Sequence, residues 1–210
     1  MKWNAFLLFI AILFVGFLLY INKPASHIPT QKKKENLAPE ETQAERLNNL
    51  AMQAADFCRK KKYNQDVCFL IDMRRPSGKK RFFIYDLKNR KIKDAGLVAH
   101  GSCNSLFLSE GKFSNVEGGG CSSLGRYKVG NRYNGNFGQA FKLHGLDSTN
   151  SNAFKRFVVL HAYHCVPDIE VYPAPICNSL GCPMISYKFL DVVNKEISRS
   201  SKPILLWIFK

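Results

Sequence analysis

The chain has 210 residues, with 31 lysines and arginines against 16 aspartates and glutamates, which gives a formal net charge of +15. This length predicts one domain of ordinary size plus extensions. The basic residues are spread along the chain and no nucleic-acid-binding motif accompanies them, which argues against nucleic acid as the partner. A basic surface suits an anionic membrane or cell wall instead.

The N-terminus carries a membrane signal. Residues 3–21 are almost wholly apolar, carry no charge, and would span about 28 Å as a helix, close to the hydrocarbon thickness of a bilayer. This run is longer than the apolar region of a usual signal peptide, and no A-x-A site follows it. Residues 1–22 are therefore predicted to be a retained transmembrane anchor, with a cleaved signal peptide as the alternative. The positive-inside rule would keep the domain in the cytosol, but long domains are translocated despite such a bias, and cysteine usage favours export.

A polar segment and a helix follow the apolar run. Residues 23–40 are polar, contain three prolines, and predict a linker. In residues 41–62 apolar side chains recur at spacings of three and four, which is typical of one face of a helix. These side chains belong to Leu47, Leu50, Ala51, Ala54 and Phe57. We therefore expect a helical lead-in at 41–62 before the main domain at 63–210.

The main domain is predicted to be mostly β, with one or two flanking helices. Strands are predicted at 69–72, 81–87, 91–100, 156–163 and 202–210. Between 101 and 150 the chain is rich in Gly, Ser and Asn, which favours short β elements with demanding turns. Helical spacing returns at 187–200, through the apolar residues Phe189, Val192, Val193 and Ile197.

Seven cysteines favour an oxidising compartment and leave one thiol over. The simplest pairing of near neighbours gives Cys58–Cys68, Cys103–Cys121 and Cys165–Cys177, although six cysteines can pair in many other ways. Cys182 is then a candidate reactive thiol. Its alternative is a structural thiol that packs as a small apolar side chain.

A reactive thiol needs a nearby base or positive charge, because the thiolate is the nucleophile. His161 stands at the end of an apolar run, where a strand could aim its ring over the rim of a sheet. The alternative is a structural histidine at a strand end. Gly181 permits an unusual backbone and lets backbone N–H groups face a developing oxyanion. The gaps among His161, His164 and the last three cysteines match no common zinc pattern, so no metal site is predicted.

The motif around Cys182 resembles that of a known enzyme family. "HAY" followed by "SLGCP" is similar to the active-site pattern of L,D-transpeptidase catalytic domains, which are cysteine enzymes of peptidoglycan metabolism. Their signature is a histidine, then about 14 to 17 residues, then Ser/Thr-x-Gly-Cys. Seventeen residues separate His161 from Ser179 and fourteen separate His164 from it, so both histidines fit this spacing.

The flanking sequence favours His161. "RFVVLHAY" is similar to the strand that carries the histidine in the branch whose cysteine is followed by proline. Upstream blocks that resemble this branch are "AHGSC", "FSNVEGGGCSSLGRY" and "GQAFKLHGLDSTNSNAFKR". The resemblance runs from about residue 80 to about residue 190, and it implies an L,D-transpeptidase-like β-sandwich for the catalytic domain at 63–210.

The resemblance implies a thioester mechanism. Cys182, deprotonated by His161, attacks the carbonyl carbon of the third residue of a peptidoglycan stem tetrapeptide, and the terminal D-alanine leaves. Backbone N–H groups near Gly181 and Cys182 hold the oxyanion. An amine of another stem then forms a 3→3 cross-link, whereas water gives L,D-carboxypeptidase activity. The resemblance implies no metal or organic cofactor, and carbapenem-type β-lactams are expected to acylate the same thiol.

The resemblance also implies roles for neighbouring residues. Ser179 is expected to hydrogen-bond around the site, with a turn residue as the alternative reading. Tyr163 is expected to line the pocket, or alternatively to serve in packing. The candidates for substrate binding are Arg156, Ser114 and Asn115, which belong to the blocks that resemble the family.

The chain departs from the commoner motif beside the cysteine. Leu180 stands where many members have a second histidine, and Pro183 and Met184 follow the cysteine where an arginine or asparagine is common. A carboxylate clamp supplied at that place is therefore missing. Arg156 or Arg126 is a candidate replacement, with a structural role at a strand end as the alternative.

The resemblance also bears on location and partners. Peptidoglycan lies outside the cytoplasmic membrane, so the domain is expected on the periplasmic or extracytoplasmic side, anchored there or secreted if the signal is cleaved. The expected partners are peptidoglycan stem peptides and, through the N-terminal helix, the cytoplasmic membrane. Two other function classes stay open: a non-catalytic wall-binding module that keeps the fold, and a cysteine hydrolase of a different amide.

Overall fold

The computed structural model describes residues 41–210. The predicted anchor at 1–22 and linker at 23–40 lie outside the described residues. Within the described part of the chain, no helix is both long and apolar enough to cross a bilayer.

The described residues contain two α-helices, a 3-10 turn and eight strands. In chain order they are α2 (Gln43–Lys61), β1 (Val67–Asp72), β2 (Phe82–Asp86), β3 (Lys91–Gly96), β4 (Gly125–Gly135), β5 (Gly138–Gly145), η1 (Ser148–Asn150), β6 (Val159–Ala162), β7 (Met184–Ile185), α3 (Tyr187–Ser198) and β8 (Leu205–Phe209). The prediction of a mostly β fold with one or two flanking helices is confirmed, and there are two in the described residues. The 101–150 region differs from the expected short elements, because β4 and β5 form a long hairpin.

All eight strands belong to one sheet, with the order β3-β2-β1-β8-β4-β5-β6-β7. The C-terminal strand β8 pairs in parallel with β1 and antiparallel with β4, and so it joins the two halves of the sheet. Of the predicted β-sandwich, the structure thus shows the coarser feature, a mostly β fold, with the strands hydrogen-bonded in one continuous sheet. Local patterning shows which face of a strand is buried, but not that a strand from the end of the chain inserts between β1 and β4.

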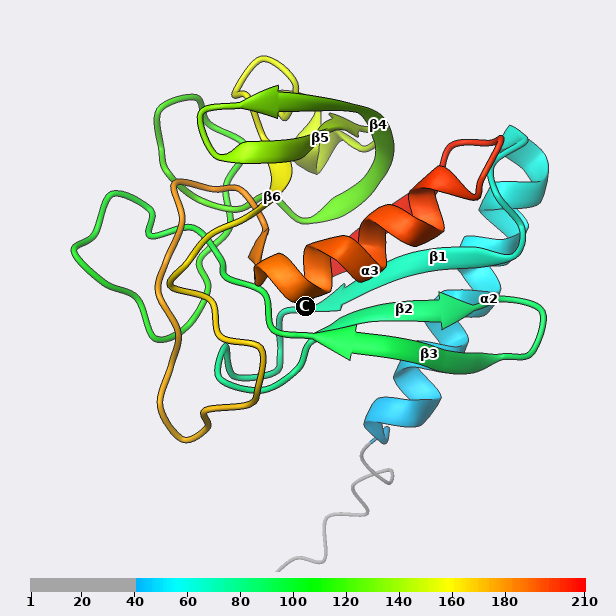
Figure 1. Ribbon diagram of the computed structural model, residues 1–210, viewed down its shortest axis with the longest axis horizontal. Coiled ribbons are helices and arrows are strands. Elements are labelled where there is room, and N and C mark those ends of the chain that lie inside the picture. The colour runs from blue at the N-terminus through cyan, green and yellow to red at the C-terminus, as the bar shows by residue number, and fades with distance from the viewer. Residues whose placement is uncertain (1–40) are drawn as a thin grey trace, which may run out of the picture. The chain divides into compact units, whose positions relative to one another are not determined.

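The two helices cover opposite faces of the β1–β3 part of the sheet, as Figure 1 shows. On one face α3 packs through Phe189, whose ring meets the ring of Phe82 edge-on at 5.3 Å between centroids. On the other face α2 packs through an apolar stripe that includes Leu47 and Ala54. Because both faces are covered, every residue of β1 is buried.

The ends of the helices follow from local sequence. Thr42 caps the N-terminus of α2 through a capping box with Glu45, in which each side chain accepts from the other residue's backbone N–H. Ser186 caps α3, where its hydroxyl accepts from the N–H of Phe189. Since Ser186 directly follows β7, this cap fixes α3 immediately after the segment that carries Cys182.

Two of the three expected disulfides are present, Cys103–Cys121 and Cys165–Cys177. The predicted Cys58–Cys68 bond is wrong, because both residues are free thiols in the core between α2 and β1. Burial raises the pKa of Cys58 to about 12, and burial also raises the pKa of Cys68. Both side chains therefore serve as small apolar groups in this core. Cys182 is the third free thiol of the described chain, and it is half-buried.

The segment that follows β3 positions the candidate site. The expected strand to His100 ends at Gly96, where a side chain on the glycine would collide with the ring of Phe189. From there the chain leaves β3 and runs beside the segment that precedes and includes β7. The N–H of Ala99 donates to the carbonyl of Met184 at 2.8 Å, and the N–H of Ser179 donates to the carbonyl of His100 at 2.8 Å.

Candidate active site

Cys182 and His161 line one cavity of about 670 Å³. His161 lies on β6, and its partner in the neighbouring parallel strand β7 is Met184, two residues after Cys182. The backbone N–H of Val159 donates to the Cys182 sulfur at 3.4 Å, which holds the thiol beside β6. The strand pairing of β6 and β7 thus brings together a thiol and an imidazole that are 21 positions apart in the chain.

The ring of His161 is held in one tautomer. Its side chain is only 2% exposed, and its Nδ1 lies 3.0 Å from the carbonyl oxygen of Ala162. A carbonyl only accepts, so Nδ1 carries the hydrogen and Nε2 keeps its lone pair. The ring stacks on Phe137 at 4.5 Å between centroids. Burial lowers the pKa of His161, although its bond to the Ala162 carbonyl opposes this, so the ring is a neutral base at neutral pH.

The Cys182 thiol is subject to opposing influences. Burial raises the pKa of Cys182, whereas the N–H of Val159 and the charge of Arg156 lower it. The net pKa is raised, so the resting thiol is protonated at neutral pH and reacts only after losing its proton to a base. His161, with Nε2 unprotonated in the same cavity, is suited to take that proton.

Ser179 and Gly181 shape the turn that presents the thiol. Gly181 has a φ of +114°, and a side chain there would lie 2.8 Å from the carbonyl oxygen of Cys121, so only glycine fits. The hydroxyl of Ser179 accepts from the N–H of Gly181 at 3.0 Å, and the hydroxyl of Ser122 donates to the Gly181 carbonyl at 3.2 Å. The Gly181 N–H, expected to face an oxyanion, is thus already bonded within the turn.

Tyr163 also lines the cavity, and its ring meets Phe137 edge-on at 5.8 Å. The alternative histidine, His164, is exposed, does not line this cavity, and packs on Tyr163. Leu180, which stands where many family members have a second histidine, lines the cavity and is 82% exposed. It therefore forms an apolar part of the cavity rim. Of the two histidines that fit the motif spacing, the structure brings His161 and not His164 to the thiol.

The other three residues expected to bind substrate make contacts within the protein and lie outside this cavity. The guanidinium of Arg156 donates to the carbonyls of Ser114 and Cys121. The Nδ2 of Asn115 donates to the Ser148 carbonyl at 3.1 Å, which ties the loop to η1. None of Arg156, Ser114 and Asn115 lines the cavity that holds Cys182 and His161.

Arg126, the other candidate clamp, forms an ion pair with Asp147. Its guanidinium also packs over the rings of Phe57 and Trp207, at 4.8 and 5.7 Å from their centroids. These contacts lie on α2 and β8, away from the residues that line the cavity of Cys182. Arg126 therefore has the structural role that was its alternative.

Sequence reasoning missed a buried polar network behind the cysteine turn. Arg81 is 1% exposed, and its Nε and Nη2 donate to the carbonyl of Val98 at 2.9 and 2.8 Å. Its Nη2 also lies 2.9 Å from Nδ1 of His100, which is fully buried. A guanidinium only donates, so Nδ1 of His100 must accept, and its ring is neutral. The block "AHGSC" was noted for its resemblance, but nothing in it indicated an arginine partner.

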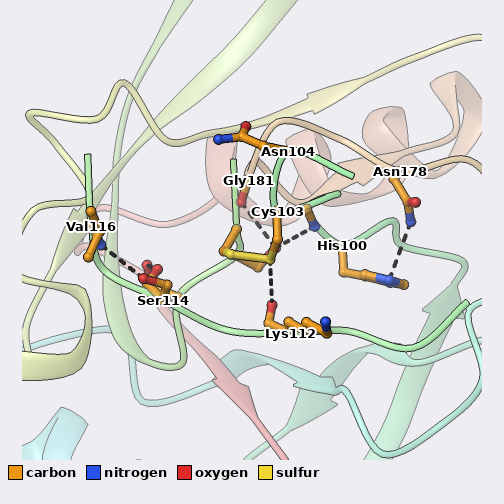
Figure 2. The surroundings of a disulfide bond; sticks show 12 residues. His100, Cys103, Asn104, Lys112, Ser114, Val116, Asn178 and Gly181 are labelled. Atoms are coloured by element: carbon orange, nitrogen blue, oxygen red, sulfur yellow. Dashed lines mark hydrogen bonds between the residues drawn. A yellow bond between two sulfur atoms is a disulfide. The ribbon is translucent and has the colours of Figure 1, made fainter. Parts of the chain in front are cut away.

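Asn178 connects this network to the cavity. Figure 2 shows its amide facing the ring of His100, with Nδ2 3.3 Å from Nε2. Because Nδ1 of His100 accepts from Arg81, Nε2 carries the hydrogen of the neutral ring, so two donors meet here and the contact is one of packing. The same amide is paired with the backbone of Leu108, accepting from its N–H at 2.6 Å and donating to its carbonyl at 3.0 Å. Because Asn178 lines the cavity and directly precedes Ser179, the network fixes the start of the cysteine turn.

The His100 network predicts a loss of stability in acid. Burial, followed by the adjacent charge of Arg81, lowers the pKa of His100 from 6.5 to about 4. Between these values the unfolded chain binds a proton that the folded chain does not, so stability is full above pH 6.5 and falls as the pH drops toward 4. The upper limit of this loss is about 3 kcal/mol. We expect His100→Gln, which keeps an acceptor for Arg81, to lose less stability over this range.

Urea unfolding at a series of pH values from 7 to 4 measures this difference. Burial also lowers the pKa values of His161 and His144, so the unfolding free energy of His100→Gln should still fall somewhat as the pH drops. His164→Gln, at an exposed histidine, is the matched control and should retain the wild-type slope. An equal slope in wild type and His100→Gln would contradict the prediction.

Comparison with known proteins identifies the family. A sequence model of the L,D-transpeptidase catalytic domain matches residues 40–207, most of the chain. The chain belongs to this family. The resemblance of the motifs is thereby confirmed, and membership supports a peptidoglycan-related enzyme of this class. No curated protein matches the chain at a significant level.

Several solved structures are remotely similar to this chain. One is the L,D-transpeptidase from Xylanimonas cellulosilytica, with 8% identity, 73% of this chain and 68% of that chain covered, and a TM-score of 0.42. The helical cell shape determining protein Pgp2 from Campylobacter jejuni has 12% identity, coverage of 74% and 55%, and a TM-score of 0.46. The L,D-transpeptidase from Mycobacterium smegmatis has 11% identity, coverage of 69% and 59%, and a TM-score of 0.39.

The chain thus spans less than two thirds of the Pgp2 and Mycobacterium smegmatis chains. With likenesses this remote, the family assignment depends on the match over residues 40–207.

Proposed function

We propose that this L,D-transpeptidase-family domain is a cysteine-dependent peptidoglycan L,D-transpeptidase with Cys182 as its nucleophile. The observation that carries the proposal is the cavity shared by Cys182 and His161, in which the bond from Nδ1 to the Ala162 carbonyl leaves Nε2 as the base. No other free thiol of the described chain can serve, because Cys58 and Cys68 are buried in the core against α2.

The chemistry proceeds in two acyl transfers. Nε2 of His161 takes the proton of the Cys182 thiol, and the sulfur attacks the carbonyl carbon of the third residue of a stem tetrapeptide. The amide bond to the terminal D-alanine breaks, the departing amine accepts the proton from His161, and a thioester between Cys182 and the stem remains. An amine of a second stem then attacks the thioester and loses a proton, which returns to the thiolate as the 3→3 cross-link forms.

We further propose that the domain works on the extracytoplasmic side of the membrane, tethered by residues 1–22. The two disulfides support this location, because such bonds form and persist in oxidising compartments. The excess of basic residues, which gives a net charge of +15, is compatible with the anionic surfaces of the cell envelope.

Mass spectrometry of products from purified muropeptides tests the function. Wild-type protein is expected to convert tetrapeptide stems into 3→3 cross-linked dimers with release of D-alanine, and Cys182→Ala is expected to form none. Tripeptide without dimers would show an L,D-carboxypeptidase instead. Unchanged muropeptides with wild type, or equal turnover by Cys182→Ala, would overturn the assignment to a cysteine transpeptidase.

A further inference from the structure

The surroundings of Cys182 and His161 disfavour the charged forms that proton transfer between them creates. Burial raises the pKa of the Cys182 thiol and lowers the pKa of His161, so both partners of the proton transfer favour their neutral forms. Leu180, which occupies the place of a second histidine, offers no charge or hydrogen bond. A fixed positive charge close to the sulfur would offset this cost, because charges interact strongly in a buried site.

Arg156 supplies such a charge from the turn before β6. Its guanidinium is half-buried and is held by neutral oxygens: Nη1 donates to the Ser114 carbonyl and to the hydroxyl of Ser123, and Nη2 donates to the Cys121 carbonyl. Among the ion pairs of residues 41–210, none includes Arg156. The nearby carboxylate of Glu117 forms its ion pair with the neighbouring Lys155, with 2.7 Å between Oε1 and Nζ. The charge of Arg156 is thus not neutralised by an acid.

The guanidinium lies against the turn that presents the thiol. Its Nη2 lies 3.2 Å from where a side chain on Gly181 would begin, directly before Cys182. Three elements present titratable groups near the sulfur: the turn before β6 presents Arg156, β6 presents His161, and β4 presents Tyr127. Burial raises the pKa of Tyr127, whose hydroxyl donates to a carbonyl, so it stays neutral. Arg156 is therefore the constant positive charge among them.

We propose that Arg156 is the electrostatic partner of Cys182. Its positive charge, which the fold holds next to Gly181 and pairs with no carboxylate of the described residues, stabilises the Cys182 thiolate. This inference rests on the proposed function only in taking Cys182 as the nucleophile. It replaces the expectation that Arg156 clamps a substrate carboxylate, since its N–H groups point to carbonyls of the protein.

The pH dependence of Cys182 alkylation by iodoacetamide tests the proposal, with labelling assigned to Cys182 by peptide mass spectrometry on the full-length protein. Arg156→Gln is expected to raise the apparent pKa of the thiol by about one unit, so that the rate at neutral pH falls about tenfold. The plateau rate at high pH should be unchanged. Ser123→Ala, which removes one acceptor of Arg156 but keeps the charge, is the matched control and should titrate as wild type does.

A second variant separates charge from packing if Arg156→Gln does not fold. Citrulline at position 156 keeps the length and most N–H donors of arginine but carries no charge, and it is expected to give the same shift. A wild-type thiol titration in either folded neutral variant would overturn the proposal, as would an equal shift in Ser123→Ala. Because alkylation needs no muropeptide, a shift without peptidoglycan turnover would contradict the proposed function alone.

Discussion

His161→Ala is expected to slow the acylation of Cys182 by about 10²- to 10⁴-fold at neutral pH, the range of a general base. The variant removes the basic Nε2 of His161, which is unprotonated because Nδ1 donates to the Ala162 carbonyl. No other histidine lines the cavity. Acylation by a carbapenem, followed by intact mass over time, measures the rate without any need for a natural substrate. The deficit should narrow as the pH rises toward the raised pKa of the thiol, since the thiolate then forms without a base.

His164→Ala is the matched control for this prediction. Its ring is exposed and packs on Tyr163 outside the cavity, so we expect an acylation rate close to that of wild type. Loss of acylation in His164→Ala with His161→Ala unaffected would show that the other histidine of the motif is the base. A rate deficit in His161→Ala that does not change with pH would point to lost packing against Phe137 rather than lost base catalysis.

The sequence predicted the elements of the site that depend on short stretches of chain. The apolar run before His161 predicted a strand, and β6 carries that histidine in the described fold. The glycine before Cys182 was expected to adopt an unusual backbone, and Gly181 has a positive φ. Such features are set by a few adjacent residues, so periodicity and residue type are sufficient to find them.

Features that depend on distant packing could not be predicted in the same way. Arg81 and Asn178 both approach His100, yet they lie 19 and 78 positions from it in the chain. The carbonyls that bind Arg156 come from the loop around the Cys103–Cys121 disulfide. Every residue has a backbone carbonyl, so residue type does not indicate which ones will accept a hydrogen bond. Residue type suggested a clamp for substrate, whereas the half-buried guanidinium of Arg156 is held by oxygens of the protein itself.

Cysteine counting failed for a related reason. Near-neighbour pairing found two bonds, because each joins two turns of one connecting segment. It failed for Cys58 and Cys68, which belong to a helix and a strand whose contact is set by apolar packing. A count of thiols cannot distinguish a bonded pair from two apolar side chains in one core.

Arg81→Met is expected to lower the free energy of unfolding by about 3 to 5 kcal/mol, because it leaves several buried acceptors without a donor. These acceptors are the carbonyls of Val98 and Arg75 and the Nδ1 of His100. Burial lowers the pKa of Arg81 to about 10, partly opposed by the charge of Asp72, so the side chain is charged at neutral pH. Urea unfolding of wild type and variant at pH 7 measures the loss.

Arg74→Met is the matched control, since Arg74 has an exposed side chain in the same connection between β1 and β2, and the substitution should change stability by less than about 0.5 kcal/mol. The stability of Arg81→Lys should fall between those of the two variants, because one ammonium keeps the charge but cannot reproduce the two bonds that converge on the Val98 carbonyl. If Arg81→Met were no less stable than Arg74→Met, the acceptors would have other donors, and the network would not hold His100. A large loss would instead show that the stability of the fold depends on one buried guanidinium, next to the segment in which the carbonyl of His100 accepts from the N–H of Ser179.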